Sequence, residues 1–342
     1  MIDYQNYFKD KKITLIGLGV LGRGVNLAKF LAELGAELTI TDLKKKEELA
    51  SSLNKLKKFK KIKYVLGRHR LADFKDRDMI IKAASVPFDS EYIKEAEKNK
   101  IPVEMDASLL AKLSPAKIIG ITGTRGKSTI THFIHFALKK NNQRVFLGGN
   151  VRGMATLPLI KEVREKDIII LELDSWQLQG FGDSKISPHI AILTNFFPDH
   201  LNYYKNSMTR YFNDKANIFK YQNREDYLII SQQAEKEIKK RYKGKIKSRV
   251  IVSKSKFPKG WKTKLIGQHN RDNLALGIKV LEIMGIKRDS VKKAAKEYPG
   301  ISGRLEFIRN FKGVSYYNDT NASSPEATIA ALNSFEQNVI LI

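Results

Sequence analysis

Gly120-Ile-Thr-Gly-Thr-Arg-Gly-Lys-Ser-Thr129 joins an apolar run from Lys117 to Thr122 to a helical pattern from Thr129 to Lys139. The apolar run has the character of a buried strand, so the order is strand, glycine-rich turn, helix. In that order the backbone N–H groups of the turn and the N-terminus of the helix can bind phosphate. The stretch therefore predicts an α/β domain with a nucleotide site. The alternative is a glycine turn before an ordinary helix.

The polar residues of this phosphate loop have definite expected roles. Lys127 would reach the β- and γ-phosphates, and Ser128 or Thr129 would hold Mg²⁺. The general pattern has its first glycine where this chain has Ile121, and the glycine falls at Gly120 instead. That shift points away from GTPases and the common ATPases. We expect ATP to be bound by the whole loop: Gly123, Thr124, Arg125, Gly126, Lys127, Ser128 and Thr129.

A second glycine-rich turn, Gly17-x-Gly19-x-x-Gly22, lies between a strand from Lys11 to Ile16 and a helix from Val25 to Leu34. The next strand, Glu37 to Asp42, ends on an acid twenty positions after the last glycine of the turn. This is the pattern and the context of a dinucleotide-binding turn. On these residues alone a nicotinamide-nucleotide dehydrogenase is an open alternative. A phosphate loop in the next domain argues against it.

The chain as a whole is predicted to be α/β and to have three parts. Strand and helix patterns alternate up to about residue 113, which indicates a Rossmann-like N-terminal domain. Ser114-Pro115 interrupts the pattern, and the strand before the phosphate loop begins a central domain with buried parallel strands. The expected domains are residues 1–113 (Rossmann-like), 114–300 (a phosphate-loop ATPase type with a parallel sheet) and 301–342 (a partial Rossmann-like domain).

Hydrophobic periodicity also places the remaining elements. Strands are expected at Tyr64–Leu66, Met79–Ala83, Ile168–Leu173 and Ile190–Thr194, and helices at Ser90–Lys98 and Asn270–Met284. In the third part we expect strands at Leu305–Arg309, Val314–Asn318 and Asn338–Ile342, and a helix near Pro325–Ser334. Because the chain stops inside the last apolar strand, we expect a fragment whose third domain is cut short.

The composition is that of an ordinary globular protein, with 42% hydrophobic and 29% charged residues. The absence of cysteine excludes disulfides, thiolate zinc sites and a cysteine nucleophile. Neither a signal sequence nor 18 consecutive apolar residues occurs, so we expect a soluble cytoplasmic protein. The net charge of +26 leaves nucleic acid open as a partner, but lysine is spread along the whole chain. We expect small-molecule substrates, no nucleic acid, no membrane insertion and a monomer.

The motifs resemble those of the Mur ligase and folylpolyglutamate synthetase superfamily over nearly the whole chain. Gly-x-x-Gly-Thr-x-Gly-Lys-Ser-Thr is similar to its ATP loop, with Arg125 where the family usually has asparagine or lysine. The segment Glu172-Leu-Asp174-Ser175-Trp-Gln177 resembles one that is typical of the branch that adds D-glutamate. Folate ligases lack an N-terminal Rossmann-like domain, so this chain is identified as a member of the Mur ligase family.

The resemblance implies a metal-dependent catalytic site. Glu172 ends a buried strand, where an unpaired carboxylate would be costly and Mg²⁺ would resolve the cost; a lysine partner is the alternative. Thr194-Asn-Phe-Phe-Pro-Asp-His200-Leu-Asn202 resembles the segment whose histidine binds or orients a second Mg²⁺, with asparagine replacing the final acid. Lys215 matches a lysine that several members carry as a carbamate. The implied catalytic residues are Lys127, Glu172, His200 and Lys215, and the implied metal ligands are Ser128, Glu172, His200 and Lys215.

Other motifs imply contacts with ATP. Gly267-Gln-His269-Asn270-Arg-Asp-Asn273 resembles the segment beside the adenine, and Asn270 and Asn273 share one helix face. A helix-capping asparagine is the alternative. Arg304 resembles an arginine that contacts phosphate, and Asp319 would hold the ribose. The lysine that follows in the family pattern is Asn321 here, so the amino-acid site stays open.

In this family the N-terminal turn binds the diphosphate of a UDP-sugar, and Gly148-Gly-Asn150 resembles a turn near the substrate. The implied UDP-substrate residues are Gly17, Gly19, Val20, Leu21, Gly22, Asp42, Asn150, Ser175 and Gln177. The resemblance implies an ATP-dependent, amide-forming ligase of peptidoglycan precursor synthesis. It would add D-glutamate to UDP-N-acetylmuramoyl-L-alanine through an acyl phosphate. A ligase that adds L-alanine or a diamino acid remains open.

Overall fold

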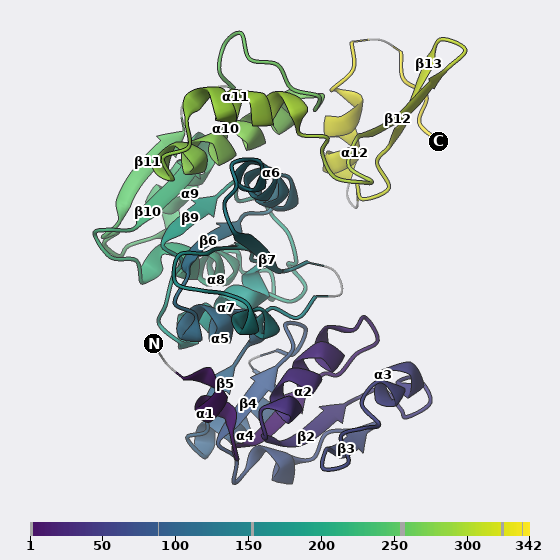
Figure 1. Cartoon of the computed structure of the whole chain (residues 1–342), viewed down its shortest axis with the longest axis vertical. Coiled ribbons are helices and arrows are strands. Elements are labelled where there is room, and N and C mark those ends of the chain that lie inside the picture. The colour runs from purple at the N-terminus through teal and green to yellow at the C-terminus, as the bar shows by residue number, and fades with distance from the viewer. Residues whose placement is uncertain (1–2, 88, 152–153, 254–256, 323–324, 337) are drawn as a thin grey trace. The chain divides into compact units, whose positions relative to one another are not determined.

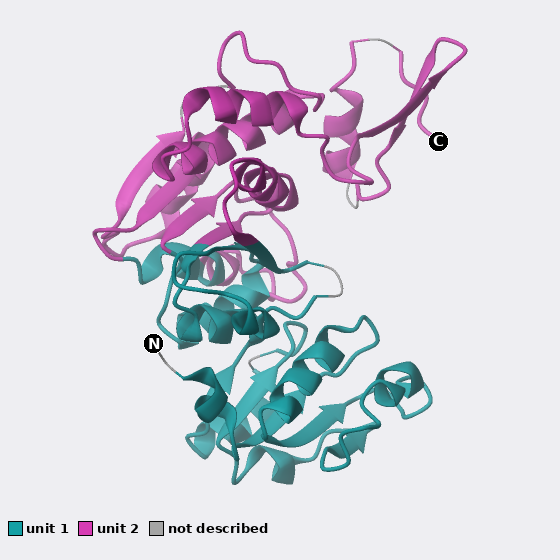
Figure 2. Cartoon of the chain, viewed as in Figure 1, with its two compact units in different colours: residues 1–118, 146–188, 213–222 teal, residues 119–145, 189–212, 223–342 magenta. Residues whose placement is uncertain are grey.

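The computed structural model describes residues 3–87, 89–151, 154–253, 257–322, 325–336 and 338–342 (Figure 1). The chain divides into two compact units (Figure 2). Unit 1 contains residues 1–118, 146–188 and 213–222, and unit 2 contains residues 119–145, 189–212 and 223–342. The predicted α/β class with parallel sheets is confirmed. The predicted domain boundaries after residues 113 and 300 remain predictions.

The first sheet belongs to unit 1 and has the strand order β3-β2-β1-β4-β5, with every pair parallel. Leu15 of the central strand pairs with Ile40 on one side and Ile81 on the other, and all three side chains are buried. The strand order reverses at β1, which is where doubly wound sheets bind ligands. Its strands are β1 (Lys12–Ile16), β2 (Glu37–Asp42), β3 (Lys63–Leu66), β4 (Met79–Lys82) and β5 (Val103–Glu104).

Helices connect these strands. In α2 (Arg23–Glu33), Val25, Ala28 and Leu31 recur at helical spacing and are at most 1% exposed, so this face packs on β2. The other helices before residue 117, where the second sheet begins, are α1 (Tyr4–Phe8), α3 (Ala50–Asn54), η1 (Leu71–Phe74), α4 (Glu91–Lys98) and α5 (Asp106–Leu113).

The second sheet has the strand order β11-β10-β9-β6-β8-β7. Strands β8 and β9 are buried at every residue, as expected for parallel strands covered on both faces. The strands are β6 (Lys117–Thr122), β7 (Val145–Gly149), β8 (Ile168–Glu172), β9 (Ile190–Leu193), β10 (Tyr227–Ser231) and β11 (Arg249–Ser253). The associated helices are α6 (Lys127–Lys140), η2 (Leu157–Lys161), α7 (Ser175–Asp183), α8 (Met208–Lys220), α9 (Gln232–Arg241), α10 (Gln268–Ile283) and α11 (Arg288–Glu297).

The segment after residue 300 departs from prediction at its end. Strands β12 (Glu306–Phe311) and β13 (Val314–Asn318) form an antiparallel hairpin, followed by α12 (Pro325–Leu332). The predicted strand Asn338–Ile342 is wrong, because residues 338–342 have no regular structure and Ile340 is 86% exposed. A strand needs a neighbour to bond its backbone groups, and no described strand pairs with this segment.

The other predicted strands and helices are confirmed, with ends that differ by at most two residues. The most useful difference concerns α6, which begins at Lys127 instead of Thr129. Lys127 and Ser128 therefore belong to the first helical turn, where N–H groups lack carbonyl partners within the helix. None of the described helices is both long and apolar enough to cross a membrane.

Candidate active site

The phosphate loop follows the carboxyl end of β6 and leads directly into α6. Gly123 has a φ of 146° and Gly126 a φ of 86°, and both values lie where glycine is favoured. Gly126 is also the N-cap of α6, and no side chain caps the first N–H groups there. These donors can therefore bind an anion together with the positive end of the helix dipole.

Two neighbouring segments leave no room for a side chain at these glycines. A Cβ atom on Gly123 would lie 3.0 Å from Thr194 Cβ, just after β9. A Cβ atom on Gly126 would lie 3.0 Å from Asn273 Cγ, on α10. Within unit 2 the fold thus brings together the phosphate loop, the start of the Asp-His segment and the segment assigned to adenine.

The segment after β9 fastens the phosphate loop through backbone and side-chain hydrogen bonds. The Asn195 carbonyl accepts from the Thr124 N–H at 3.0 Å, and Asn195 Oδ1 accepts from the Arg125 N–H at 2.8 Å. Thr194 Oγ1 donates to the Arg125 carbonyl at 2.6 Å. Sequence reasoning gave no role to Thr194 or Asn195. The available signal was a polar pair directly after a buried strand.

Arg125, which is expected to bind ATP with the rest of the loop, donates to a carboxylate in the structure. Its Nη1 donates to Asp199 Oδ2 at 2.7 Å. Burial alone would raise the pKa of Asp199, but the bond from Arg125 and the nearby positive charges lower it overall. His200 Nε2 lies 3.8 Å from the same carboxylate. Arg125 thus ties the loop to the Asp199-His200 segment, and its contact with phosphate remains a prediction.

Lys127 projects from the first turn of α6 back over the loop. Its Nζ donates to the carbonyls of Gly123 at 3.0 Å and Thr124 at 3.1 Å. The ammonium group is therefore held beside the glycines that would surround the phosphates. Of the two hydroxyls considered for Mg²⁺, Ser128 is half-buried and Thr129 only 8% exposed. The more accessible Ser128 is the better candidate.

The two asparagines at the start of α10 behave differently. The N-cap of this helix is Gly267, and Asn270 Nδ2 donates to the Ile266 carbonyl at 2.8 Å. Asn270 is therefore not the helix cap that the sequence left open as an alternative. Asn273, one turn further on, faces Gly126 of the phosphate loop. Contact of either residue with adenine remains a prediction.

Asp319 and Arg304 lie in the segment that follows α11. Asp319 Oδ1 accepts from the N–H of Leu305, the residue after Arg304, at 3.0 Å. Burial lowers the pKa of His269, and the charge of Asp319 opposes that effect, so Asp319 also lies near the start of α10. Arg304 is exposed. The fold therefore places Asp319, the predicted ribose residue, near His269 of the predicted adenine segment.

In unit 1, the N-terminal glycine turn lies against the loop after β4. Gly17 and Gly19 have positive φ values of 93° and 60°. A Cβ atom on Gly17 would lie 2.9 Å from Ala83 Cβ, so the two loops pack closely. Two predicted substrate residues at the tip of the turn, Val20 and Leu21, are 56% and 69% exposed. They are accessible to a ligand.

Asp42, the acid that ends β2, binds the backbone around the turn. Its Oδ2 accepts from the Gly19 N–H and its Oδ1 from the Lys44 N–H, each at 2.9 Å. In dinucleotide enzymes the corresponding acid binds a ribose hydroxyl. Here both oxygens already hold protein N–H groups. Gly22, with a φ of 91°, is the N-cap of α2 and has no side chain to cap it.

Glu172 and Asn150 are joined at the carboxyl ends of β8 and β7. The Asn150 N–H donates to the Glu172 carbonyl at 2.6 Å. Gly149, with a φ of 83°, packs so closely on the Glu172 backbone that any Cβ atom would collide with it. Glu172 is 5% exposed, and among the described residues no hydrogen bond or ion pair engages its carboxylate. None of the described lysines pairs with the Glu172 carboxylate, so the structure does not show the lysine partner that the sequence left open as an alternative.

The chemistry of Glu172 fits a magnesium ligand, because a buried carboxylate without a partner suits a hard cation. Within the described ranges, no three acidic or histidine side chains cluster tightly enough to enclose a metal. Magnesium in nucleotide enzymes commonly uses one or two carboxylates together with phosphate oxygens and water. The chemistry of the Glu172 carboxylate is compatible with such a ligand.

Ser175, Gln177 and Lys215 are all buried. Asp174 Oδ1 accepts from the Gln177 N–H at 2.7 Å, and Gln177 Oε1 accepts from the Asp174 N–H at 3.2 Å. This reciprocal pair is a capping box at the start of α7, and its spacing was visible in the sequence. Ser175 is 1%, Gln177 4% and Lys215, on α8, 2% exposed. Their contacts with substrate or metal remain predictions.

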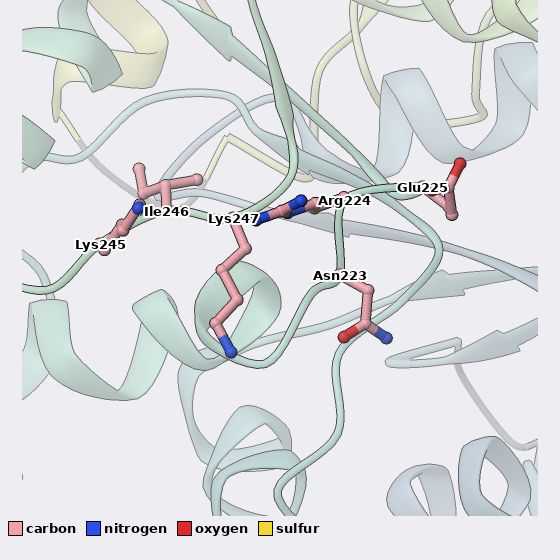
Figure 3. Close-up of a pocket in the computed structure, with 6 residues that line it drawn as sticks. All are labelled: Asn223, Arg224, Glu225, Lys245, Ile246 and Lys247. Carbon is pink, nitrogen blue, oxygen red and sulfur yellow. The ribbon is translucent and has the colours of Figure 1, made fainter.

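A hollow of about 500 Å³ in unit 2 is lined by three basic side chains among others (Figure 3). It is formed by the segments that precede β10 and β11, whereas the phosphate loop follows the carboxyl end of its strand. The hollow therefore lies at the opposite edge of the sheet. Its lining residues are Asn223, Arg224, Glu225, Lys245, Ile246 and Lys247.

Comparison with known proteins identifies the family. Residues 121–282 match the Mur ligase middle domain. The UDP-N-acetylmuramoylalanine–D-glutamate ligase of Clostridium acetobutylicum is 34% identical over 99% of this chain and 76% of its own length. The ligase of the same name from Roseiflexus sp. is 30% identical over 97% of this chain and 77% of its own length.

Solved structures agree on the fold. The UDP-N-acetylmuramate–alanine ligase of Thermotoga maritima superposes with a TM-score of 0.58 at 20% identity, covering 95% of this chain and 77% of that one. The MurF ligase of Thermotoga maritima, solved in complex with ADP, has a TM-score of 0.55 at 17% identity, with coverages of 97% and 74%. With the phosphate loop, its Asp-His partner segment and the N-terminal glycine turn all in place, the chain belongs to the Mur ligase family.

Proposed function

We propose that this chain is the D-glutamate-adding ligase of peptidoglycan precursor synthesis. In this reaction ATP phosphorylates the terminal carboxylate of UDP-N-acetylmuramoyl-L-alanine, and the amine of D-glutamate then displaces the phosphate. The observation that carries the proposal is the 34% identity, over 99% of the chain, to a curated ligase of that name. That alignment includes both glycine-rich turns, so it supports the nucleotide and the UDP-substrate halves together.

The geometry of unit 2 supports ATP as the nucleotide. Gly123 and Gly126 give the loop its positive φ values, and Lys127 Nζ lies over the loop carbonyls. Asn273 on α10 contacts the loop, which supports adenine binding at the start of that helix. Asp319, near His269 of that helix, would contact the ribose, and Arg304 would contact phosphate.

The geometry of unit 1 supports a diphosphate-containing substrate. The turn from Gly17 to Gly22 lies at the point where the strand order reverses, and it leads into the uncapped N-terminus of α2. Asp42 fixes the shape of that turn through Gly19. Asn150, Ser175 and Gln177 would contribute to the same substrate from the central sheet.

Magnesium would reduce the charge repulsion between the substrate carboxylate and the γ-phosphate. The residues that would hold it at two sites are Ser128, Glu172, His200 and Lys215. Lys215 is only 2% exposed and matches the lysine that several members of the family carry as a carbamate. Carbamylation would join the lysine amine to CO₂, release a proton and replace the cation with an oxygen ligand. We therefore propose that Lys215 is carbamylated in the active protein.

The chemistry requires charge stabilisation more than proton transfer. In the first step a carboxylate oxygen bonds to the γ-phosphorus while the bond to the β-phosphate oxygen breaks, and ADP leaves. In the second step the amine nitrogen attacks the acyl carbon, phosphate leaves and a proton is lost. Lys127 would offset the negative charge that gathers on the transferred phosphoryl group.

The identity of the incoming amino acid is the most specific part of the proposal. Asn321 replaces the lysine of the family pattern, and its Nδ2 donates to the Ser302 carbonyl at 3.1 Å. An asparagine in that place offers no full positive charge to a carboxylate. A panel of D-glutamate, L-alanine and a diamino acid therefore belongs in the test.

The proposal is tested by ADP release in the presence of UDP-N-acetylmuramoyl-L-alanine, ATP, Mg²⁺ and each amino acid in turn. We expect release to depend on D-glutamate and to fall at least about 100-fold in Lys127→Ala. Lys139→Ala removes an exposed lysine from the same helix and should retain wild-type activity. Turnover with L-alanine or a diamino acid alone would reject D-glutamate as the substrate. Full activity in Lys127→Ala would reject the assigned ATP site.

A further inference from the structure

Arg23 belongs to none of the motifs described above and has no role in the proposed reaction, yet its side chain makes several hydrogen bonds. It is the first residue of α2 and directly follows the N-terminal glycine turn. Its Nη2 donates to the carbonyls of Gly149 at 3.2 Å and Val151 at 3.1 Å, and its Nε donates to the carbonyl of Met154 at 3.2 Å. One half-buried guanidinium group thus binds three backbone carbonyls that lie more than 120 residues away.

The local electrostatics of α2 do not account for an arginine at this position. The N-terminus of a helix carries a partial positive charge and favours acidic residues, yet the first turn of α2 contains none. A cation there is unfavourable for the helix itself. The compensating interactions are the three distant carbonyls, so the side chain serves a tertiary contact.

The segment that Arg23 binds carries one residue of the proposed site, Asn150, and contacts a second, Glu172. Asn150 lies between the carbonyls of Gly149 and Val151, and its N–H donates to the Glu172 carbonyl at 2.6 Å. The tight packing of Gly149 on the Glu172 backbone makes this a close junction. The turn is therefore held by Arg23 on one side and by the end of β8 on the other.

We propose that Arg23 is a positioning residue that fixes the Gly149–Val151 turn, and with it Asn150 and Glu172, relative to the N-terminal glycine turn. The inference rests on the proposed function, because Asn150 and Glu172 have their roles only in that reaction. Arg23 links the turn expected to bind diphosphate with the carboxylate expected to hold magnesium. Substrate bound at the first site is thereby aligned with the reacting groups at the second.

A planar guanidinium group suits this task better than an ammonium group. Its donors point in fixed directions and can serve several acceptors at once, while lysine offers a compact charge on a flexible stem. Arg23→Lys consequently keeps the positive charge near the glycine turn but loses the planar set of N–H donors. This variant separates positioning from simple attraction of a phosphate.

The first measurement needs no ligand. Hydrogen exchange of the full chain is followed at the amides of residues 149–151 in wild type, Arg23→Lys and the control Lys29→Ala, which removes a cation from the same helix. We expect exchange at this turn to speed up on the order of tenfold in Arg23→Lys and to stay unchanged in Lys29→Ala. Equal exchange in wild type and Arg23→Lys would overturn the inference.

The second measurement is steady-state kinetics with the three substrates. In Arg23→Lys we expect kcat to fall roughly 10- to 100-fold, with KM for ATP within about twofold of wild type, because a misplaced turn affects the reacting geometry. Unchanged kcat would overturn the positioning role. An inactive wild-type chain would refute the proposed function, and the exchange result would then still decide whether Arg23 holds the turn.

Discussion

Replacing Lys82 with methionine should remove a pH-dependent rise in stability that we expect the wild-type chain to show in alkaline solution. Lys82 ends β4, is 2% exposed, and donates from Nζ to the Val86 carbonyl at 2.6 Å. Burial lowers its pKa from the usual 10.5 to about 8, although the charges of Asp183, Asp174 and Asp214 act in the opposite direction. The folded chain therefore binds this proton more weakly than the unfolded chain does.

The size and sign of the effect follow from these two pKa values. Below pH 8 the lysine is protonated in both states, and the folded state carries the full cost of the buried charge, about 3 kcal/mol. Between about pH 8 and 10.5 the unfolded chain binds more protons, so stability rises with pH. Above 10.5 the cost has disappeared. Burial raises the pKa of Asp183 to about 6, so that carboxyl stays ionised throughout this window.

The assay is denaturant unfolding of wild type and Lys82→Met at pH 7, 8, 9 and 10. The difference in free energy of unfolding between the two proteins should change by about 2 to 3 kcal/mol between pH 7 and pH 10, in favour of wild type. The other lysines and tyrosines titrate in both proteins, so their contributions to the free energy of unfolding cancel in this difference. Removing Lys82 also removes a positive charge near Asp183, Asp174 and Asp214, which adds an offset that is constant with pH once these acids are ionised in both proteins. Lys63→Met, an exposed lysine of the same sheet, should show no such change. A difference that stays flat with pH would refute the reasoning.

Two glycine substitutions test the two ligand sites separately. Gly126→Ala forces a Cβ atom against Asn273 and should raise KM for ATP at least about tenfold, whereas Gly285→Ala, with a similar φ of 74° and open space around it, should not. Gly17→Ala forces a Cβ atom to 2.9 Å from Ala83 Cβ and should weaken UDP binding in calorimetry without changing affinity for ATP. Unchanged affinities in these variants would contradict the assigned sites.

The strands and helices were predictable because their causes are local. Continuous apolar runs gave β8 and β9, and helical spacing gave α2, α6 and α10, all within two residues of their observed ends. The glycines of the phosphate loop adopt positive φ values that other residues seldom tolerate. The loop could therefore be recognised from its own sequence before any long-range contact was known.

The candidate site was predictable only in part. The sequence singled out Glu172 as a costly buried carboxylate, and the structure buries this residue, with no hydrogen bond or ion pair to its carboxylate among the described residues. It did not indicate that Arg125 pairs with Asp199, because the two residues are 74 positions apart in the chain. It gave no role to Asn195, whose bonds to the loop depend on β6 and β9 being neighbours.

The predicted strand at residues 338–342 shows the same limit from the other direction. An apolar run can favour a strand, but a strand exists only where another strand bonds its backbone. Among the described residues none does so here, and Ile340 is exposed. The segment is apolar, as the sequence shows, but the prediction that it pairs with another strand is wrong.

The sequence by itself determined the α/β class, the two glycine-rich turns and the residues that can bind phosphate, since these depend on backbone conformation and local periodicity. Only the tertiary structure decided which distant groups meet. Arg125 pairs with Asp199, Lys82 is buried, and Arg23 donates to carbonyls of the Gly149–Val151 turn. Each of these environments depends on parts of the chain that no local sequence pattern connects. Charge and hydrogen bonding act through space, so their partners are set by the packing of the strands.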